Sequence, residues 1–265
     1  MNIFDTHCHY NLEPFLENWQ SHWEKAREHG VVNSTVVGVD LETSKQAVKL
    51  AEENSSLHAA VGLHPNSIVS ERSLQSIKAD VSDLEAIISN QVVAIGETGL
   101  DYFRLPTDLT AELIRKTQKA AFTAHIQLAQ KKELPLIIHV RDTQEDAYWD
   151  VLTLLKEQNF NQPFVLHCAS GPTKYIQQAL QLGAYIGLAG NITYKNSSHL
   201  RDLVEFTPSN KIVLETDAPF LPPVSYRGKT CEPWMIGHTA TFCQDELRLD
   251  LQQIYQNSLN LFQID

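Results

Sequence analysis

Side chains able to bind a metal ion recur along this chain at the ends of short apolar segments. They are His7, His9, Glu97, His139, His167 and Asp217. The preceding segments are rich in β-branched residues, so each of these side chains is expected at or just past the carboxyl end of a β-strand. In an eight-stranded βα barrel all such ends open onto one face, where the active sites of that fold lie. Residues far apart in the sequence could therefore meet around one metal centre.

Eight segments have the continuous apolar composition of parallel strands that are covered on both faces. They span residues 2–6, 31–39, 57–62, 92–95, 134–138, 163–166, 184–188 and 211–214. Helices are expected at 13–29, 43–54, 70–90, 107–132, 143–158, 173–182 and 197–206, and one or two closing helices at 233–265. This alternation predicts an α/β fold, a (βα)8 TIM barrel with C-terminal closing helices. The 265 residues match the ~250 of one barrel, so residues 1–265 are expected to form a single domain.

Composition restricts the functional classes and the location. A net charge of −11 disfavours a duplex-binding protein, because such proteins usually carry a basic face. The sequence contains no apolar run of ~18 residues and no signal peptide, so we expect a cytoplasmic protein with no membrane segment. The four cysteines lack C-x-x-C spacing and are expected to be reduced. No obligate protein partner is evident.

The first two histidines have the spacing of a chelate. His7 and His9 are two residues apart, and because strand side chains alternate, both can point to one metal while Cys8 turns away. An H-x-H pair is not rare in a chain with 11 histidines, so the spacing alone is weak evidence for a metal site. The position of the pair at the end of the first strand is what supports metal binding.

Glu97 is expected directly after the fourth strand, where its two oxygens could bridge two cations. A capping or salt-bridged glutamate is the structural alternative. Asp101 and Arg104 follow in the same loop, where a surface ion pair is an equal alternative to a substrate contact.

His139 and His167 end the fifth and sixth strands. Either one alone could be a satisfied core histidine, but two in succession at equivalent positions favour metal ligation. Cys168 is expected to face away from His167 as a small buried hydrophobe.

Asp217 follows the last strand and could bind one metal while accepting a proton from a water molecule. Glu215 alternates with it and is a weaker alternative for that role. His64 follows the third strand, where a substrate contact and a structural turn residue are equal alternatives.

With these residues in place, the chain resembles the TatD-related deoxyribonucleases of the metal-dependent hydrolase superfamily, which are built on a βα barrel. The resemblance runs from residue 4 to about residue 233. It is carried by FDTHCH at 4–9, GLHP at 62–65, GETGLDY at 96–102, PLIIHVRD at 135–142 and LETDAP at 214–219. It implies hydrolysis of phosphodiester bonds in DNA, often as a 3′-end exonuclease.

The resemblance also implies a site for two divalent ions. One ion would be held by His7, His9, Glu97 and Asp217, and the other by Glu97, His139 and His167. Mixed imidazole and carboxylate ligands accept Zn, Mg, Mn, Fe or Ni. The resemblance further suggests substrate contacts by His64, Arg104, Lys195 and Arg227.

Two positions depart from the family pattern. Ala169 stands where such proteins commonly carry Phe, and Cys231 where Asn is usual. Both are expected near the mouth of the pocket, where they would affect the choice of substrate and leave metal binding unchanged.

Together these features predict a metal-dependent hydrolase with Asp217 as proton acceptor and Glu97 as bridge. Two divalent cations would outweigh the two carboxylates, so the pocket would be positive on an acidic protein. DNA ends or short single strands are therefore the expected substrates. Two alternatives are an amidohydrolase-type enzyme acting on an amide or lactone, and a non-catalytic metal-binding scaffold. The scaffold is disfavoured because a structural metal does not need an open site.

Overall fold

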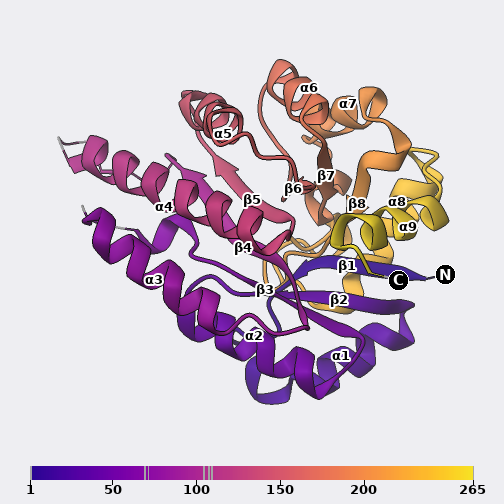
Figure 1. The fold of residues 1–265 in the computed structure, drawn as a ribbon. Helices are drawn as coiled ribbons and strands as arrows, with labels where there is room; N and C mark the ends of the chain where they lie inside the picture. The colour runs from indigo at the N-terminus through magenta and orange to yellow at the C-terminus, as the bar shows by residue number, and fades with distance from the viewer. Residues whose placement is uncertain are drawn as a thin grey trace.

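Eight strands form one parallel sheet in chain order, and this sheet curls into a nearly closed barrel (Figure 1). The computed structural model describes residues 2–68, 70, 72–103, 105–106, 108 and 110–264. The strands are β1 (Ile3–Cys8), β2 (Val31–Val37), β3 (Leu57–Val61), β4 (Val92–Asp101), β5 (Leu136–Arg141), β6 (Phe164–Leu166), β7 (Ala184–Leu188) and β8 (Ile212–Leu214). The predicted (βα)8 TIM barrel is confirmed.

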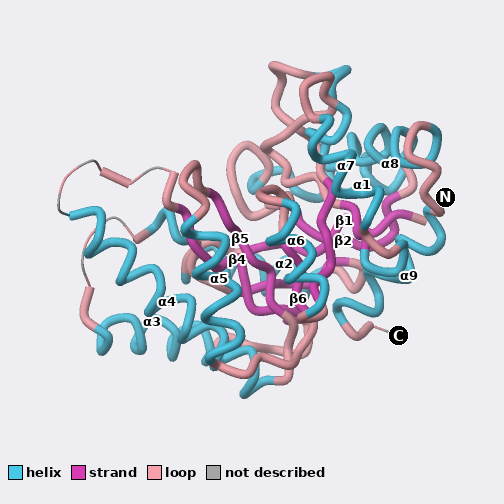
Figure 2. Tube along the Cα trace, turned by 90° about the horizontal axis from the view of Figure 1, so that it is seen from above, coloured by secondary structure: helices cyan, strands magenta, loops and turns pink. Residues whose placement is uncertain are grey.

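Helices surround the barrel, as the view in Figure 2 shows. They are α1 (Trp19–Glu28), α2 (Leu41–Glu53), α3 (Leu74–Ala86), α4 (Thr110–Lys132), α5 (Asp146–Glu157), α6 (Thr173–Gln181), α7 (Ser198–Phe206), α8 (Ile236–Asp245) and α9 (Leu251–Phe262). The last two are the expected closing helices. Among the described helices, none combines the length and the apolar character that crossing a membrane requires.

One buried apolar cluster joins the strands to the last helix. It contains Phe4, Val93 and Val213 from the strands and Leu261 and Phe262 from α9. The rings of Phe4 and Phe262 lie 5.5 Å apart between centroids. Burying each such side chain contributes about 1.5–3 kcal/mol. The C-terminal end of α9 is thus fixed against the barrel strands.

Side chains complete the barrel between β1 and β8. The buried carboxylate of Asp5 accepts hydrogen bonds from the backbone N–H (2.8 Å) and the hydroxyl (2.7 Å) of Thr216. Burial raises the pKa of Asp5 to about 7, although the bonds from Thr216 oppose that shift. Beside this contact the N–H of Asp217 donates to the carbonyl of His7 at 2.9 Å. The closure therefore places the first and last predicted metal ligands next to each other.

The fourth strand is longer than predicted, and Glu97 lies inside it. The pairing of β4 with β5 shifts register between Ile95 and Thr98, which is an irregularity able to re-aim a side chain. Gly96 in this shift has φ +155°, and a Cβ there would meet the Cβ of Ile137 at 2.7 Å. Glycine is required because the neighbouring strand leaves no room for a side chain.

Candidate active site

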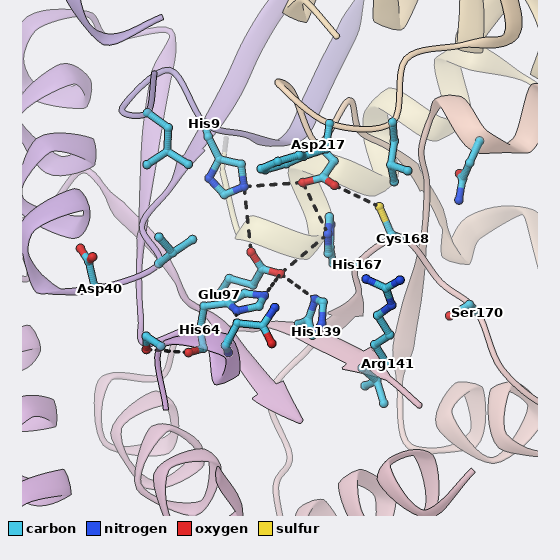
Figure 3. A pocket seen from close by; sticks show the side chains of 18 residues that line it. His9, Asp40, His64, Glu97, His139, Arg141, His167, Cys168, Ser170 and Asp217 are labelled. Carbon is cyan, nitrogen blue, oxygen red and sulfur yellow. Dashed lines mark hydrogen bonds and ion pairs between the residues drawn. The ribbon is translucent and has the colours of Figure 1, made fainter. Parts of the chain in front are cut away.

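The six predicted ligands converge at one end of the barrel. Five of them line a cavity of about 700 Å³ (Figure 3). The sixth, His7, is fully buried, and its Nε2 lies 3.4 Å from Glu97. Glu97 is 3% exposed and Asp217 is 9% exposed. A substrate must therefore enter the cavity to reach either carboxylate.

Glu97 is at the centre of the cluster. Five imidazole nitrogens lie within 4.0 Å of its oxygens: His139 Nδ1 at 3.0 Å, His64 Nε2 at 3.3 Å, His7 Nε2 at 3.4 Å, His167 Nε2 at 3.8 Å and His9 Nε2 at 4.0 Å. Burial alone would raise the pKa of Glu97, but the imidazoles, His64 first, hold it well below its usual value. Glu97 is therefore ionised at neutral pH.

Asp217 faces Glu97 across the cluster. Its Oδ1 lies 3.5 Å from His9 Nε2, 3.7 Å from His167 Nε2 and 3.8 Å from His7 Nε2. Burial would raise the pKa of Asp217, but the neighbouring imidazoles, His167 first, lower it. Asp217 has φ +58°, a left-handed conformation that aspartate tolerates better than most residues.

Backbone and carboxylate partners decide which nitrogen carries the proton in His9 and His139. The Nδ1 of His9 lies 2.9 Å from the carbonyl oxygen of Val37, which can only accept, so this nitrogen is protonated. The Nε2 of His139 lies 3.3 Å from Asp101 Oδ2. Burial would raise the pKa of Asp101, but the contact with His139 outweighs burial and lowers it. In both histidines the remaining lone pair points at the cluster.

The same arrangement holds at His167 and explains why the donor set fits a metal. Its Nδ1 lies 3.2 Å from Glu215 Oε1, which leaves the Nε2 lone pair directed toward Glu97 and Asp217. The Nε2 atoms of His7 and His9 are 3.1 Å apart. Lone pairs that face each other and two carboxylates repel unless a proton or a cation lies between them. Divalent transition metals bind to imidazole and carboxylate groups of this kind, in which the other ring nitrogen donates its proton to a partner outside the metal site.

His64 differs from the other histidines of the site. Its Nδ1 accepts the N–H of Asn66 at 3.0 Å, so the proton of the neutral ring is on Nε2, which lies 3.3 Å from Glu97. This nitrogen can donate to Glu97 and has no lone pair for a metal. His64 also lines the cavity, where its predicted contact with substrate stays a prediction.

Two of the other predicted substrate contacts, Lys195 and Arg227, lie outside the cavity lining. Lys195 and Arg227 are exposed, and Arg227 lies over the ring of Tyr194, 4.8 Å from its centroid. Arg104 lies outside the described residues. The structure does not bring Lys195 or Arg227 to the ligand cluster.

The two departures from the family pattern are core residues. Ala169 is 6% exposed and Cys231 is 1% exposed, and both belong to the main hydrophobic cluster. The described cavity lining contains neither residue, although Cys168 and Ser170 on either side of Ala169 line it, so the expected position near the mouth stays a prediction.

The expectation that Cys168 faces away from the site is wrong. Its side chain lines the cavity, with Sγ 3.9 Å from Asp217 Oδ2 (Figure 3). The alternation of a strand no longer applies there, because β6 ends at Leu166 and Cys168 has φ +44°. Burial raises the pKa of this thiol well above its usual value, so it stays neutral.

Glu215 has a positioning role that the sequence did not reveal. It is fully buried, and its Oε1 accepts from the backbone N–H of Cys168 and lies 3.2 Å from His167 Nδ1, with which it can form an ion pair. A Cβ at position 187 would lie 2.8 Å from its oxygens, so Gly187 makes the space it occupies. A carboxylate behind a metal-binding imidazole fixes the orientation of the ring and raises its basicity.

Replacing Glu215 with Gln tests this role. The amide oxygen can still accept from the N–H of Cys168 and face His167 Nδ1, so the change removes mainly the charge. We expect metal affinity to fall by roughly 10- to 100-fold, the usual effect of losing such a partner. Titration of the metal-free protein with a competing chelator measures it. Asp101→Asn behind His139 is the parallel variant, and unchanged affinity in both would contradict the role.

Metal binding should release protons, because the same imidazole nitrogens bind either a proton or a metal ion. Burial lowers the pKa of His167, but the nearby carboxylates, Glu215 first, outweigh burial and raise it to about 10. At pH 7 the metal-free site therefore holds at least this proton, which a bound cation displaces. Calorimetry at pH 7–8 in buffers of different ionisation enthalpy should show release of at least one proton, decreasing above about pH 10.

The sign of the stability effect follows from the same shift. An imidazole whose pKa is raised from the unfolded value of about 6.5 stabilises the metal-free fold fully below that pH. His167 loses this contribution as the pH rises through about 10. Metal-free protein should therefore lose stability between these values. A contribution that instead grows with pH would show that His167 is not protonated in the metal-free site.

Comparison with known proteins places the chain in a family. The family described as TatD related DNase matches residues 4–263. YabD of Bacillus subtilis, described as an uncharacterized metal-dependent hydrolase, is 32% identical over 272 residues, covering 99% of this chain and all of that protein. An uncharacterized metal-dependent hydrolase of Mycoplasma pneumoniae is 34% identical over 265 residues, covering 97% of this chain and 96% of its own.

Solved structures show the same fold. YjjV, a TatD homologue from Escherichia coli, superimposes with a TM-score of 0.83 at 28% identity, over 99% of this chain and 98% of its own. A TatD family hydrolase from Entamoeba histolytica gives a TM-score of 0.79 at 22% identity over 98% of each chain. The chain belongs to the TatD-related DNase family of metal-dependent hydrolases.

Proposed function

We propose that this protein hydrolyses phosphodiester bonds at the 3′ end of single-stranded DNA, using two divalent metal ions. The observation that carries the proposal is the convergence of imidazole nitrogens from His7, His9, His139 and His167 on two carboxylates that line a cavity. Membership of the TatD-related DNases supports a nucleic-acid substrate. Zn, Mg, Mn, Fe and Ni remain candidates for the metal, and a cytoplasmic location remains a prediction.

The contacts suggest how two ions would be shared. His7, His9 and Asp217 have donor atoms within 4.8 Å of one another and would hold one ion. His139 and His167 would hold the other, and Glu97 lies close enough to both groups to serve each. Ions bound there would lower the pKa of a water molecule and offset the negative charge on the phosphate oxygens.

Asp217 is the proposed general base. Its lowered pKa keeps Oδ1 and Oδ2 ionised at neutral pH, ready to accept a proton from the attacking water. The water oxygen forms a bond to phosphorus as the bond from phosphorus to the sugar oxygen breaks, and that sugar oxygen then takes up a proton. His64 Nε2 lies 3.3 Å from Glu97 and can donate to it, which keeps Glu97 an acceptor.

Substrate form tests the proposal. The carboxylates lie at the floor of a cavity in a protein of net charge −11, so long duplex DNA meets repulsion from the surrounding surface, while a single strand can enter end first. Metal-stripped protein, reconstituted one ion at a time, should cut single-stranded DNA labelled at either end faster than duplex, and should remove nucleotides from the 3′ end.

The control substrates are closed circular duplex DNA, lactones and dipeptides. Equal cleavage inside circular duplex would refute an end-directed enzyme. Turnover of a lactone or dipeptide without any cleavage of DNA would replace the proposal with an amidohydrolase-type activity on the same residues. Metal binding without turnover of any of these substrates would favour the scaffold alternative.

A further inference from the structure

An exposed aromatic ring lies beside the ligand cluster. Phe220 is 53% exposed although it lines the cavity, three residues after Asp217. Its ring is nearly perpendicular to that of His9, with centroids 6.2 Å apart and an interplanar angle of 76°. A large apolar side chain left half open to water inside a ligand cavity is an informative exception to burial.

The position of Phe220 is set by its backbone. Its N–H donates to the carbonyl of Asp217 at 2.7 Å, and the N–H of Cys231 donates to the carbonyl of Pro219 at 3.1 Å. The turn that carries the ring is thus tied both to a proposed metal ligand and to a buried core residue. Because the backbone is already fixed, a ligand that packs on the ring needs to order only the side chain.

Arg141 brings a positive charge into the same cavity. It lies two residues after His139 on β5, so both side chains project to one side of the strand. Figure 3 shows it extending into the cavity beside Ser170. Its guanidinium carbon is 3.9 Å from the centroid of the Phe103 ring, and it forms no ion pair among the described residues. A stacked, unpaired guanidinium is well suited to bind a phosphate.

We propose that Phe220 and Arg141 form a nucleotide subsite, in which the ring stacks on an unpaired base near the 3′ end and the guanidinium binds a flanking phosphate. This inference rests on the proposed function and extends it. An aromatic ring can stack on any base, so the site is tolerant of sequence. It requires a base whose face is free, which paired and stacked bases inside a duplex do not offer. The preference for single strands would then come from stacking as well as charge.

The sharpest test removes each partner of the stack in turn. The substrates are a 5′-labelled single strand and the same strand with an abasic residue at the terminal or the neighbouring position. For wild-type protein, loss of the base should lower kcat/KM by roughly 5- to 100-fold, the range of base–aromatic stacking. Phe220→Ala should show that loss on the intact strand and little further loss on the abasic one.

Matched variants separate stacking from apolar contact and from folding. Phe220→Trp should keep the discrimination, whereas Phe220→Leu, which is apolar but has no ring, should behave as Phe220→Ala. Leu74→Ala removes an exposed apolar side chain (63% exposed) that does not line the cavity, and should match wild type. Arg141→Gln should reduce the slope of log affinity against log salt by about 0.7.

Binding without turnover makes the two proposals separable. A strand ending in 2-aminopurine should lose fluorescence on binding to metal-free wild-type protein, and keep it with Phe220→Ala. Equal wild-type rates on intact and abasic strands, with no change in fluorescence, would overturn the subsite while leaving the nuclease in place. Loss of fluorescence without cleavage under any metal would support the subsite and refute the phosphodiesterase.

Discussion

Asp217→Asn is expected to lower turnover by roughly 10²-fold or more while metal content changes little. The amide oxygen can still coordinate a cation, but the neutral group cannot accept a proton from water, and general base catalysis typically contributes 10²- to 10⁴-fold. Steady-state cleavage of a labelled single strand and elemental analysis of the same preparation measure the two quantities together.

Two other variants serve as controls for this result. Asp40→Asn alters another carboxylate of the cavity lining, and Asn can keep the helix cap that Asp40 makes with the N–H of Thr43, so near-normal turnover is expected. His139→Ala should lose metal and activity together. If Asp217→Asn retains near-normal turnover with both metals bound, the base is another group, and Glu215 or His64 is tested next.

Glu97→Gln is expected to have the larger effect, about 10³-fold on turnover, with a fall in the number of bound ions from two to one. This carboxylate is the acidic group shared by both halves of the cluster, with an oxygen 3.0 Å from His139 Nδ1 and another 3.4 Å from His7 Nε2. Removing its charge weakens the hold on both cations, and each lost 1.4 kcal/mol of transition-state stabilisation is about tenfold in rate.

Metal titration by calorimetry, followed by elemental analysis, checks the expected stoichiometry. Glu215→Gln is the matched control. It also removes a buried carboxylate charge, but that carboxylate contacts a proposed ligand and not the cations, so binding should weaken without loss of a site. If carefully reconstituted wild-type protein never exceeds one ion per chain, the bridging role of Glu97 is wrong.

Much of the architecture could be predicted because it depends on local patterns. Short apolar runs become buried parallel strands, and strand alternation places His7 and His9 on one side of the chain. The rule that strand ends share one face of a barrel then gathers ligands that lie up to 210 positions apart in the chain. None of these steps requires knowing which side chains touch.

Local patterns failed where the backbone leaves regular geometry. Glu97 lies within a strand whose register shifts, and Cys168 turns toward the cavity because its strand has already ended. In both places a glycine or a left-handed residue changes the direction of a side chain, and alternation no longer predicts it.

The sequence by itself determined the barrel and the donor atoms, since apolar periodicity and residue chemistry belong to each segment alone. Only the tertiary structure decided how those donors are used. The proton of His9 is fixed by the carbonyl of Val37, and the ring of His167 by Glu215, through contacts of 2.9 and 3.2 Å between different strands or their ends. It also decided that Phe220 stays open to the cavity, because burial and hydrogen-bond partners are properties of the packed chain.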